Sequence, residues 1–269
     1  MIEKARALRE KLSALGAVVV AYSGGVDSAF LAWTAHDTLG RRALAVTADS
    51  PSYPERHRQM ALEVATRFGL QHEVIRTREL ERPEYRANPA NRCYFCKQEL
   101  YTRLAPIAAA RGAVVVDGSN ADDRADYRPG RQAARELGVR SPLDEADLCK
   151  DEIRELSRRA GLPTWDEPAS ACLSSRIPYH SDVTDEKLRM IERAEEALRA
   201  IGFRVCRVRH HDDVARVEVG AAELPRALST EVSEAIAREL SAIGYRRVTI
   251  DPKGYRAGSL NEGLLLRPV

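Results

Sequence analysis

The chain has 269 residues, enough for one large domain or two smaller ones, and 44% of them are hydrophobic, so it can bury a core without metal or disulfide staples. Its 42 basic and 40 acidic residues give a formal net charge of +2, which argues against nucleic acid or a membrane surface as a partner. The mixed-charge N-terminus lacks the apolar core of a signal peptide and no apolar run approaches the ~20 residues of a membrane span, so we expect a cytoplasmic protein.

The first predicted strand, 17–22, is a continuous apolar run that suits a strand buried on both faces of a parallel sheet. It is followed by Ser-Gly-Gly-Val-Asp-Ser at 23–28 and then by a helical pattern. Gly24 and Gly25 allow a close backbone approach to an anion, and the two flanking serines, Ser23 and Ser28, can donate hydroxyl hydrogen bonds. A helix N-terminus adds free N–H groups and partial positive charge. The stretch therefore predicts a phosphate-binding loop, and it is not a Walker A loop because no Gly-Lys-Ser/Thr follows.

Strands and helices alternate through the first half of the chain, which predicts a doubly wound α/β parallel sheet with ligands at the carboxyl ends of its strands. The further strands are expected at 43–47, 72–76 and 114–117, and helices at 3–15, 56–68 and 150–160. Polar residues follow the second and fourth strands, where we expect further nucleotide contacts: Asp49, Ser50, Gly118, Asn120 and Asp122. Asp27 and Asp122 are candidates for Mg²⁺ or ribose, because hard cations prefer oxygen ligands. Asp27 could instead orient the loop through backbone N–H groups.

The second half changes character after a predicted linker at 163–168, so we expect domains at 1–165 and 166–269. The predicted elements are a helix at 183–201, strands at 203–209 and 215–219, a helical stripe from Leu224 to Leu240 and a strand at 246–250. This order predicts a small α+β domain with a mostly antiparallel sheet, used for substrate binding or oligomerisation.

Three cysteines form the candidate metal site: Cys93 and Cys96 as a C-x-x-C, and Cys172. A thioredoxin-like pair normally begins a helix, and the lead-in rich in Asn and Pro does not resemble that arrangement. Zinc usually takes four protein ligands, and a second C-x-x-C is missing. Three thiolates suit a [4Fe–4S] cluster with one open iron, which could hold an extra sulfide for delivery.

The loop at 23–28 resembles the pyrophosphate loop of the PP-loop ATP pyrophosphatases, in which a substrate oxygen attacks the α-phosphorus of ATP. Together with 117–123, 128–130, 138–143 and 168–179, it resembles the LarE family, whose ATP-dependent sulfur transferases help to build the nickel-pincer nucleotide of lactate racemase. The resemblance implies that ATP adenylates a carboxylate of pyridinium-3,5-biscarboxylic acid mononucleotide. Pyrophosphate then leaves, and sulfur displaces AMP to give a thiocarboxylate.

The family has two versions of sulfur delivery. In one, the cysteine that matches Cys172 gives up its own sulfur and becomes dehydroalanine. In the other, three cysteines hold a [4Fe–4S] cluster and the enzyme turns over repeatedly. We favour the cluster version here, because the sacrificial version leaves Cys93 and Cys96 unexplained. The resemblance also implies a sulfide donor and a homo-oligomer.

Two arginines of the second domain, Arg207 and Arg209, lie two apart on a predicted strand, so both guanidinium groups point to the same face. Such a pair could clamp a phosphate, although exposed strand residues would look the same. The resemblance places them at the substrate phosphate, together with Ser175 and Arg176.

The resemblance also marks Glu195 and Glu223 as acidic positions near a subunit interface or a divalent ion; on helices rich in glutamate, either could simply be solvated. His180 stands where the family pattern has a glycine, which leaves open the backbone shape just beyond the Cys172 loop.

Three other functions fit part of the pattern. A tRNA thiolase of the PP-loop group is opposed by the near-zero net charge. An amide-forming synthetase would need an ammonia source, and no glutaminase domain is visible. A non-enzymatic nucleotide sensor would not require the three thiols. The expected partner is therefore a small-molecule nucleotide, not nucleic acid or a membrane.

Overall fold

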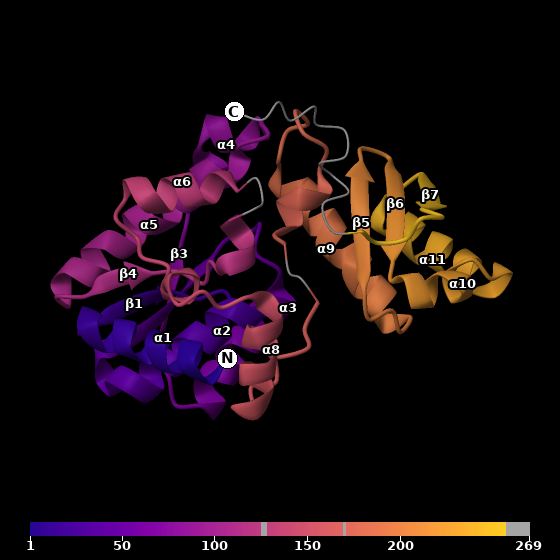
Figure 1. The fold of residues 1–269 in the computed structure, drawn as a ribbon. Helices are drawn as coiled ribbons and strands as arrows, with labels where there is room; N and C mark the ends of the chain where they lie inside the picture. Colours follow the sequence, from indigo (N-terminus) through magenta and orange to yellow (C-terminus); the bar gives the residue numbers. More distant parts are fainter. Residues whose placement is uncertain (125–127, 169–170, 257–269) are drawn as a thin grey trace. The chain divides into compact units, whose positions relative to one another are not determined.

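The structure, a computed structural model, describes residues 1–124, 128–168 and 171–256 (Figure 1). The chain forms two compact units. Unit 1 takes its described residues from Met1–Tyr85 and Ala90–Ser170, and unit 2 from Arg86–Pro89 and Ala171–Val269. Along the described part of the chain, no helix has both the length and the apolar character needed to cross a bilayer.

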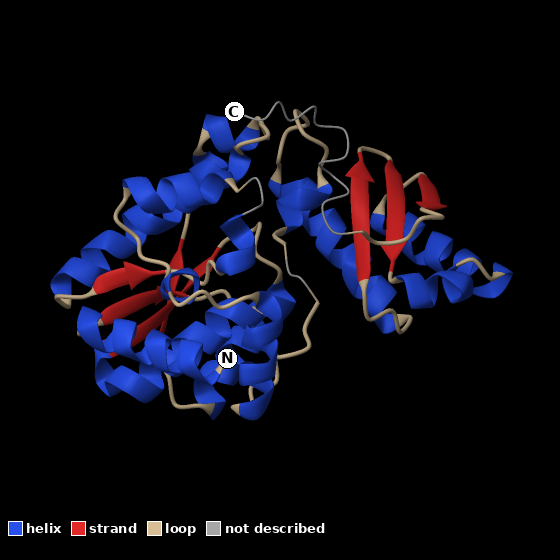
Figure 2. Cartoon of the chain, in the orientation of Figure 1, coloured by secondary structure: helices blue, strands red, loops and turns tan. Residues whose placement is uncertain are grey.

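Unit 1 is built on a parallel sheet of four strands in the order β3-β2-β1-β4 (Figure 2). The strands are β1 (Val18–Ala21), β2 (Ala43–Asp49), β3 (Gln71–Arg76) and β4 (Val114–Val116). The central strand β1 pairs in parallel with both neighbours, Val19 lying opposite Leu44 on one side and Val115 on the other. The predicted parallel α/β sheet is confirmed.

Helices cover both faces of this sheet, because successive side chains of a strand point to opposite sides. The helices of unit 1 are α1 (Ile2–Leu15), α2 (Val26–Leu39), α3 (Glu55–Arg67), α4 (Pro83–Arg86, whose last residue belongs to unit 2), α5 (Arg92–Ala110), α6 (Pro129–Glu136), α7 (Pro142–Glu145) and α8 (Lys150–Arg159). Val18 and Val20 share a core with α1, α2 and α8. Val19 and Ala21 share a second core with α5 and α6.

Unit 2 packs helices against a three-stranded sheet in the order β5-β6-β7. Its elements are α9 (Asp185–Ala200), β5 (Cys206–His211), β6 (Val214–Val219), α10 (Leu224–Ala227), α11 (Thr230–Ile243) and β7 (Arg247–Ile250). The core joins α9 and α11 to the inner face of the strands through residues such as Leu198, Val208 and Ile236.

Two expectations for this unit need correction. The sheet is mixed, because β5 and β6 are antiparallel whereas β6 and β7 are parallel. A crossover containing α11 separates β6 from β7, and such a crossover allows the two strands to run the same way. The stripe from Leu224 to Leu240 is not one helix either. It is split at Ser229, whose extended backbone (φ −64°, ψ 146°) ends α10 and begins α11.

Candidate functional site

The phosphate loop follows β1, all four residues of which are buried. Gly24 has φ +64°, and a Cβ placed on it would lie 2.9 Å from the Cβ of Ala61 on α3, so both its backbone conformation and its surroundings require glycine. Gly25 is the N-cap of α2, which begins at Val26. The first N–H groups of that helix have no acceptor inside it and carry the positive end of the helix dipole. The loop can therefore receive an anion through its backbone.

The two serines of the loop are joined across the turn. The Ser28 hydroxyl donates to the carbonyl of Gly25 (3.2 Å) and lies 3.1 Å from the backbone N of Ser23, which donates to it. The two hydroxyl oxygens are 3.0 Å apart, so Ser23 is the donor when Ser28 uses its proton on Gly25. Tyr53 also donates to the Ser23 carbonyl (2.9 Å). The loop is thus held in its turn by its own side chains.

The segment after β4 presses against this helix N-terminus. A Cβ on Gly118 would lie 3.0 Å from the backbone N of Ser28, so glycine permits the close approach. The neighbouring Asp117 is buried, and its carboxylate accepts hydrogen bonds from the hydroxyls of Tyr101 (2.7 Å) and Ser141 (2.8 Å). This buried carboxylate braces the segment that carries Gly118.

Three predicted polar residues meet beside the loop, and a fourth that the sequence did not single out joins them. Asn120 donates to Asp27 Oδ1 (3.3 Å), and the Lys150 ammonium lies 2.5 Å from Asp27 Oδ2. The backbone N–H of Lys150 donates to the Asp122 carboxylate (2.8 Å), which places Asp122 at the N-terminus of α8. The sequence did carry one signal for Lys150. A cation in the first turn of a helix opposes the helix dipole, so its charge indicates that an acidic partner lies nearby.

Asp49 and Ser50 lie at the end of β2, as expected, and both are half-buried. The Ser50 hydroxyl is 2.9 Å from that of Ser52, which in turn donates to the buried Glu79 (2.7 Å). The predicted ATP contacts thus lie at the carboxyl ends of β1, β2 and β4, on the polar edge of one sheet.

The C-x-x-C of unit 1 lies at the start of a helix, contrary to our expectation for its lead-in. Asn91 is the N-cap of α5, so Cys93 and Cys96 occupy its first turns, with Cys93 exposed and Cys96 half-buried. Asn91 makes no side-chain cap hydrogen bond, so its residue type does not by itself explain the helix start. Residues three apart share a helix face, so both thiols are presented on one side.

Cys172 belongs to unit 2 and precedes a 3-10 turn at Leu173–Arg176. Its carbonyl accepts from the backbone N–H and the hydroxyl of Ser175 (3.0 and 2.8 Å) and from Arg176 Nη1 (3.0 Å). Residues 169–170 of the predicted segment 168–179 lie outside the described residues. Among the described residues, no group of three or more His, Cys, Asp or Glu side chains is assembled that could hold a metal ion.

Arg176 and Glu195 form a fully buried ion pair, each with 1% of its side chain exposed and with Nε 2.7 Å from Oε1. All three guanidinium nitrogens of Arg176 have protein partners: Glu195 takes two, and Nη1 donates to the loop around Cys172. Burial alone would raise the pKa of Glu195, but the Arg176 guanidinium holds it below the usual range. Arg199 adds a second cation (3.0 Å). Arg176 therefore anchors the Cys172 loop through the hydrogen bonds that its Nη1 donates.

The two predicted arginines of β5, Arg207 and Arg209, are both buried. Arg209 Nη2 lies 2.7 Å from Glu218 and Nη1 donates to the Ser175 carbonyl (2.9 Å), so Arg209 connects the strand to the same loop. Arg207 stacks 5.1 Å from the Tyr255 ring centroid, and burial together with the neighbouring Arg176 charge lowers its pKa. Burial is the larger cause, and an anion beside this guanidinium would favour its charged form.

Glu223 and His180 each have a local role. The carboxylate of Glu223 accepts hydrogen bonds from the backbone N–H groups of Arg204 (2.9 Å) and Val205 (3.1 Å), which orders the entry to β5. His180 adopts φ +66°, a conformation that glycine takes without strain and that non-glycine residues rarely adopt.

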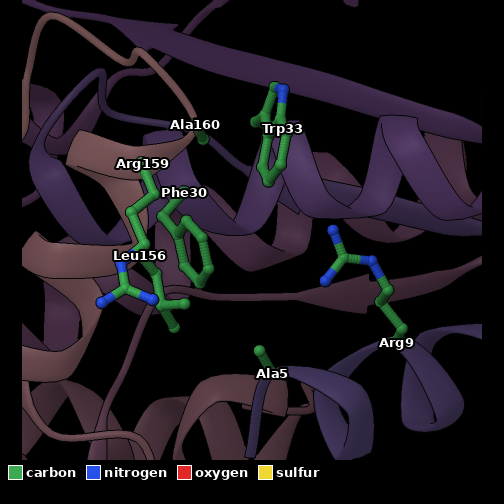
Figure 3. A pocket seen from close by; sticks show the side chains of 7 residues that line it. All are labelled: Ala5, Arg9, Phe30, Trp33, Leu156, Arg159 and Ala160. Carbon is green, nitrogen blue, oxygen red and sulfur yellow. The ribbon is translucent and has the colours of Figure 1, made fainter. Parts of the chain in front are cut away.

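A separate cavity of about 440 Å³ lies between α1, α2 and α8 (Figure 3). Phe30, Trp33 and Leu156 supply its apolar lining, and Arg9 and Arg159 also line it. Arg9 is already paired with Asp37 (3.0 Å) and Arg159 with Glu155 (2.7 Å). None of the predicted site residues lines this cavity, so it is distinct from the phosphate loop.

Comparison with known proteins gives both partial and nearly complete matches. Residues 5–91 match the asparagine synthase family. The chain is 37% identical to pyridinium-3,5-bisthiocarboxylic acid mononucleotide synthase of Lactiplantibacillus plantarum, over 94% of this chain and 92% of that protein. It is 44% identical to an uncharacterized protein of Synechocystis, over 96% of both chains. A GMP synthase of Aeropyrum pernix is 27% identical over 67% of this chain and 39% of its own length.

Proposed function

This chain belongs to the LarE family of PP-loop sulfur transferases, and we propose that it uses ATP to adenylate a carboxylate of pyridinium-3,5-biscarboxylic acid mononucleotide and then replaces AMP with sulfur. The product is a thiocarboxylate on the route to the nickel-pincer nucleotide. The observation that carries the proposal is the 37% identity, over nearly the whole chain, to a pyridinium-3,5-bisthiocarboxylic acid mononucleotide synthase. The predicted family and the predicted ATP-dependent enzyme class are confirmed.

We assign the ATP phosphates to the loop at 23–28 and the rest of the nucleotide to the ends of β2 and β4. The free N–H groups at the start of α2 and the positive φ of Gly24, which shapes the turn before them, support this assignment. Mg²⁺ at Asp27 would compete with the Lys150 ammonium for the same carboxylate. Lys150 is thus placed where it could move from Asp27 to a phosphate oxygen.

We assign the substrate phosphate to Arg207, Arg209 and Ser175. The buried guanidinium of Arg207 beside the Arg176 charge, and the hydrogen bond from Arg209 to the Ser175 carbonyl, support this assignment. Arg176 contributes by holding the Cys172 loop. A role for Glu195 and Glu223 at an interface or a divalent ion stays a prediction; in this chain their carboxylates already accept hydrogen bonds from protein donors.

For sulfur delivery we propose a [4Fe–4S] cluster ligated by Cys93, Cys96 and Cys172. The donor set is accessible: these three thiols are exposed or half-buried, as is Cys149 at the N-cap of α8, whereas Cys206 is buried and burial raises its pKa to about 11. Such a cluster would supply an iron that is free to hold the sulfide to be transferred. The sacrificial use of Cys172 remains the alternative. A sulfide donor, a homo-oligomer and a cytoplasmic location stay predictions.

The test is anaerobic purification and reconstitution, with iron and acid-labile sulfide measured per chain. We expect about four irons per chain in the wild type. Cys93→Ala should lose both the iron and multiple-turnover thiolation. Cys149→Ser should retain both. Cys149 is a suitable control because it is the N-cap of α8 and serine preserves that cap. Absence of iron, with loss of one H₂S from Cys172 after a single turnover, would establish the sacrificial version. AMP formation that requires tRNA would overturn the assigned substrate.

A further inference from the structure

A four-residue segment, Arg86–Pro89, belongs to unit 2 although it stands between two stretches of unit 1. Its backbone is held there by two hydrogen bonds. The N–H of Val183 donates to the Arg86 carbonyl (2.8 Å), and the N–H of His180 donates to the Asn88 carbonyl (2.9 Å). The segment is thus bonded to the stretch of chain at 177–183, which follows the Cys172 turn.

Asn88 is the centre of this contact. It is fully buried, and its side-chain Nδ2 donates to the carbonyls of Ile177 (3.3 Å), Pro178 (2.7 Å) and Ser181 (3.0 Å). Its backbone is left-handed (φ +52°), a conformation that asparagine tolerates better than most residues. A carboxylate could not donate to these carbonyls, so an amide is required.

Both partners in this contact are close in sequence to cysteines predicted to handle sulfur. On one side, the stretch at 177–183 continues from the turn that Arg176 anchors behind Cys172. On the other side, Cys93 follows Pro89 by four residues, and four extended residues span at most about 14 Å. The covalent chain therefore limits how far the C-x-x-C can move from the contact, whatever the arrangement of the two units.

We propose that Asn88 is a positioning residue that ties the segment leading to Cys93 and Cys96 to the loop behind Cys172, so that one cluster can reach all three thiols. This inference rests on the proposed cluster. Asn88 acts through the backbone carbonyls it binds. Its loss removes the three hydrogen bonds to the stretch at 177–183 and does not alter the phosphate loop of unit 1.

The first test measures the contact itself, without reference to iron. Asn88→Gly removes the amide and keeps a residue that adopts positive φ without strain. We expect hydrogen exchange of the His180 and Val183 amides to rise at least tenfold. The matched control is Asn91→Gly, which makes the same change at an exposed N-cap between the segment and Cys93 and should leave exchange within twofold. Exchange that stays within twofold in Asn88→Gly overturns the inference.

The second test measures positioning. We expect iron to leave reconstituted Asn88→Gly at least tenfold faster than wild type under a chelator such as EDTA, while the Kd for ATP stays within twofold. Equal rates of iron loss overturn the positioning role, and a parallel loss of ATP affinity does so as well, because it indicates general unfolding. A wild type that binds no iron refutes the proposed cluster, and the exchange ratio then decides whether Asn88 holds the loop.

Discussion

The phosphate loop of unit 1 and the arginine cluster of unit 2 (Arg176, Arg207 and Arg209) are both candidate phosphate sites, but they are built in different ways. The first uses backbone N–H groups and a glycine whose positive φ and close approach to Ala61 disfavour any side chain. The second uses buried side chains that neutralise one another, as Arg176 does with Glu195. A backbone site depends on conformation, whereas a site of buried charges depends on every partner remaining in place. Mutations in the two units should therefore have different main effects, on ATP affinity in unit 1 and on the free energy of unfolding in unit 2.

The largest effect is expected from Glu195→Gln, because it leaves the Arg176 guanidinium buried without a full counter-charge. We expect a loss of about 3–5 kcal/mol in the free energy of unfolding of unit 2, measured by urea denaturation. Glu196→Gln changes the exposed neighbour on the same helix and should cost less than about 0.5 kcal/mol. Similar losses in the two variants would show that the buried pair contributes nothing specific.

The next effect tests the backbone site. Gly24→Ala places a Cβ against Ala61 at a positive φ, so we expect at least a tenfold loss of ATP affinity and a stability loss of about 1–3 kcal/mol. Gly16→Ala is the matched control, since Gly16 also has positive φ (+75°) but an added Cβ would meet nothing within 4 Å. Isothermal titration with ATP separates them: equal affinities in the two variants would contradict a crowded phosphate loop.

A smaller effect is expected at the cation beside the loop. Lys150→Met removes the partner of Asp27 and a positive charge close to the predicted phosphates, so ATP affinity should fall about tenfold. Lys150→Arg should recover part of this loss, because the charge remains. Lys11→Met on α1 serves as the control for a lost lysine. Unchanged ATP affinity in Lys150→Met would remove Lys150 from the nucleotide site.

The last effect is absent at neutral pH and concerns stability in acid. Burial lowers the pKa of His210 to about 4, so the folded state binds this proton less readily than the unfolded state, in which the pKa is about 6.5. Stability should therefore be constant above pH 6.5 and decrease toward pH 4 by up to about 1.4 kcal/mol per pH unit. His210→Phe should flatten this slope, as followed by denaturation at several pH values, and the same change at the exposed His211 should affect it less. A slope that His210→Phe leaves unchanged would assign the acid sensitivity to other groups.

Local sequence predicted the order of strand, loop and helix start from residue 17 onward, because a short apolar run, two glycines and a helix start are signals read within a few residues, although α2 already begins at Val26 inside the predicted loop. It was less reliable where one pattern allows two structures. The stripe from Leu224 to Leu240 has a helical period, yet the chain turns at Ser229. The Asn- and Pro-rich lead-in to Cys93 looked irregular, yet it begins a helix.

The sequence by itself determined the phosphate loop, the parallel sheet and the family, since these depend on adjacent residues and on motifs of fixed spacing. Tertiary structure decided which charges are neutralised and where loops are anchored. Arg176 and Glu195 are 19 residues apart, and Asn88 binds carbonyls about 90 residues away. Such partners are selected by burial, because a buried charge or amide must find a complementary group wherever the fold brings one. No local pattern carries that information.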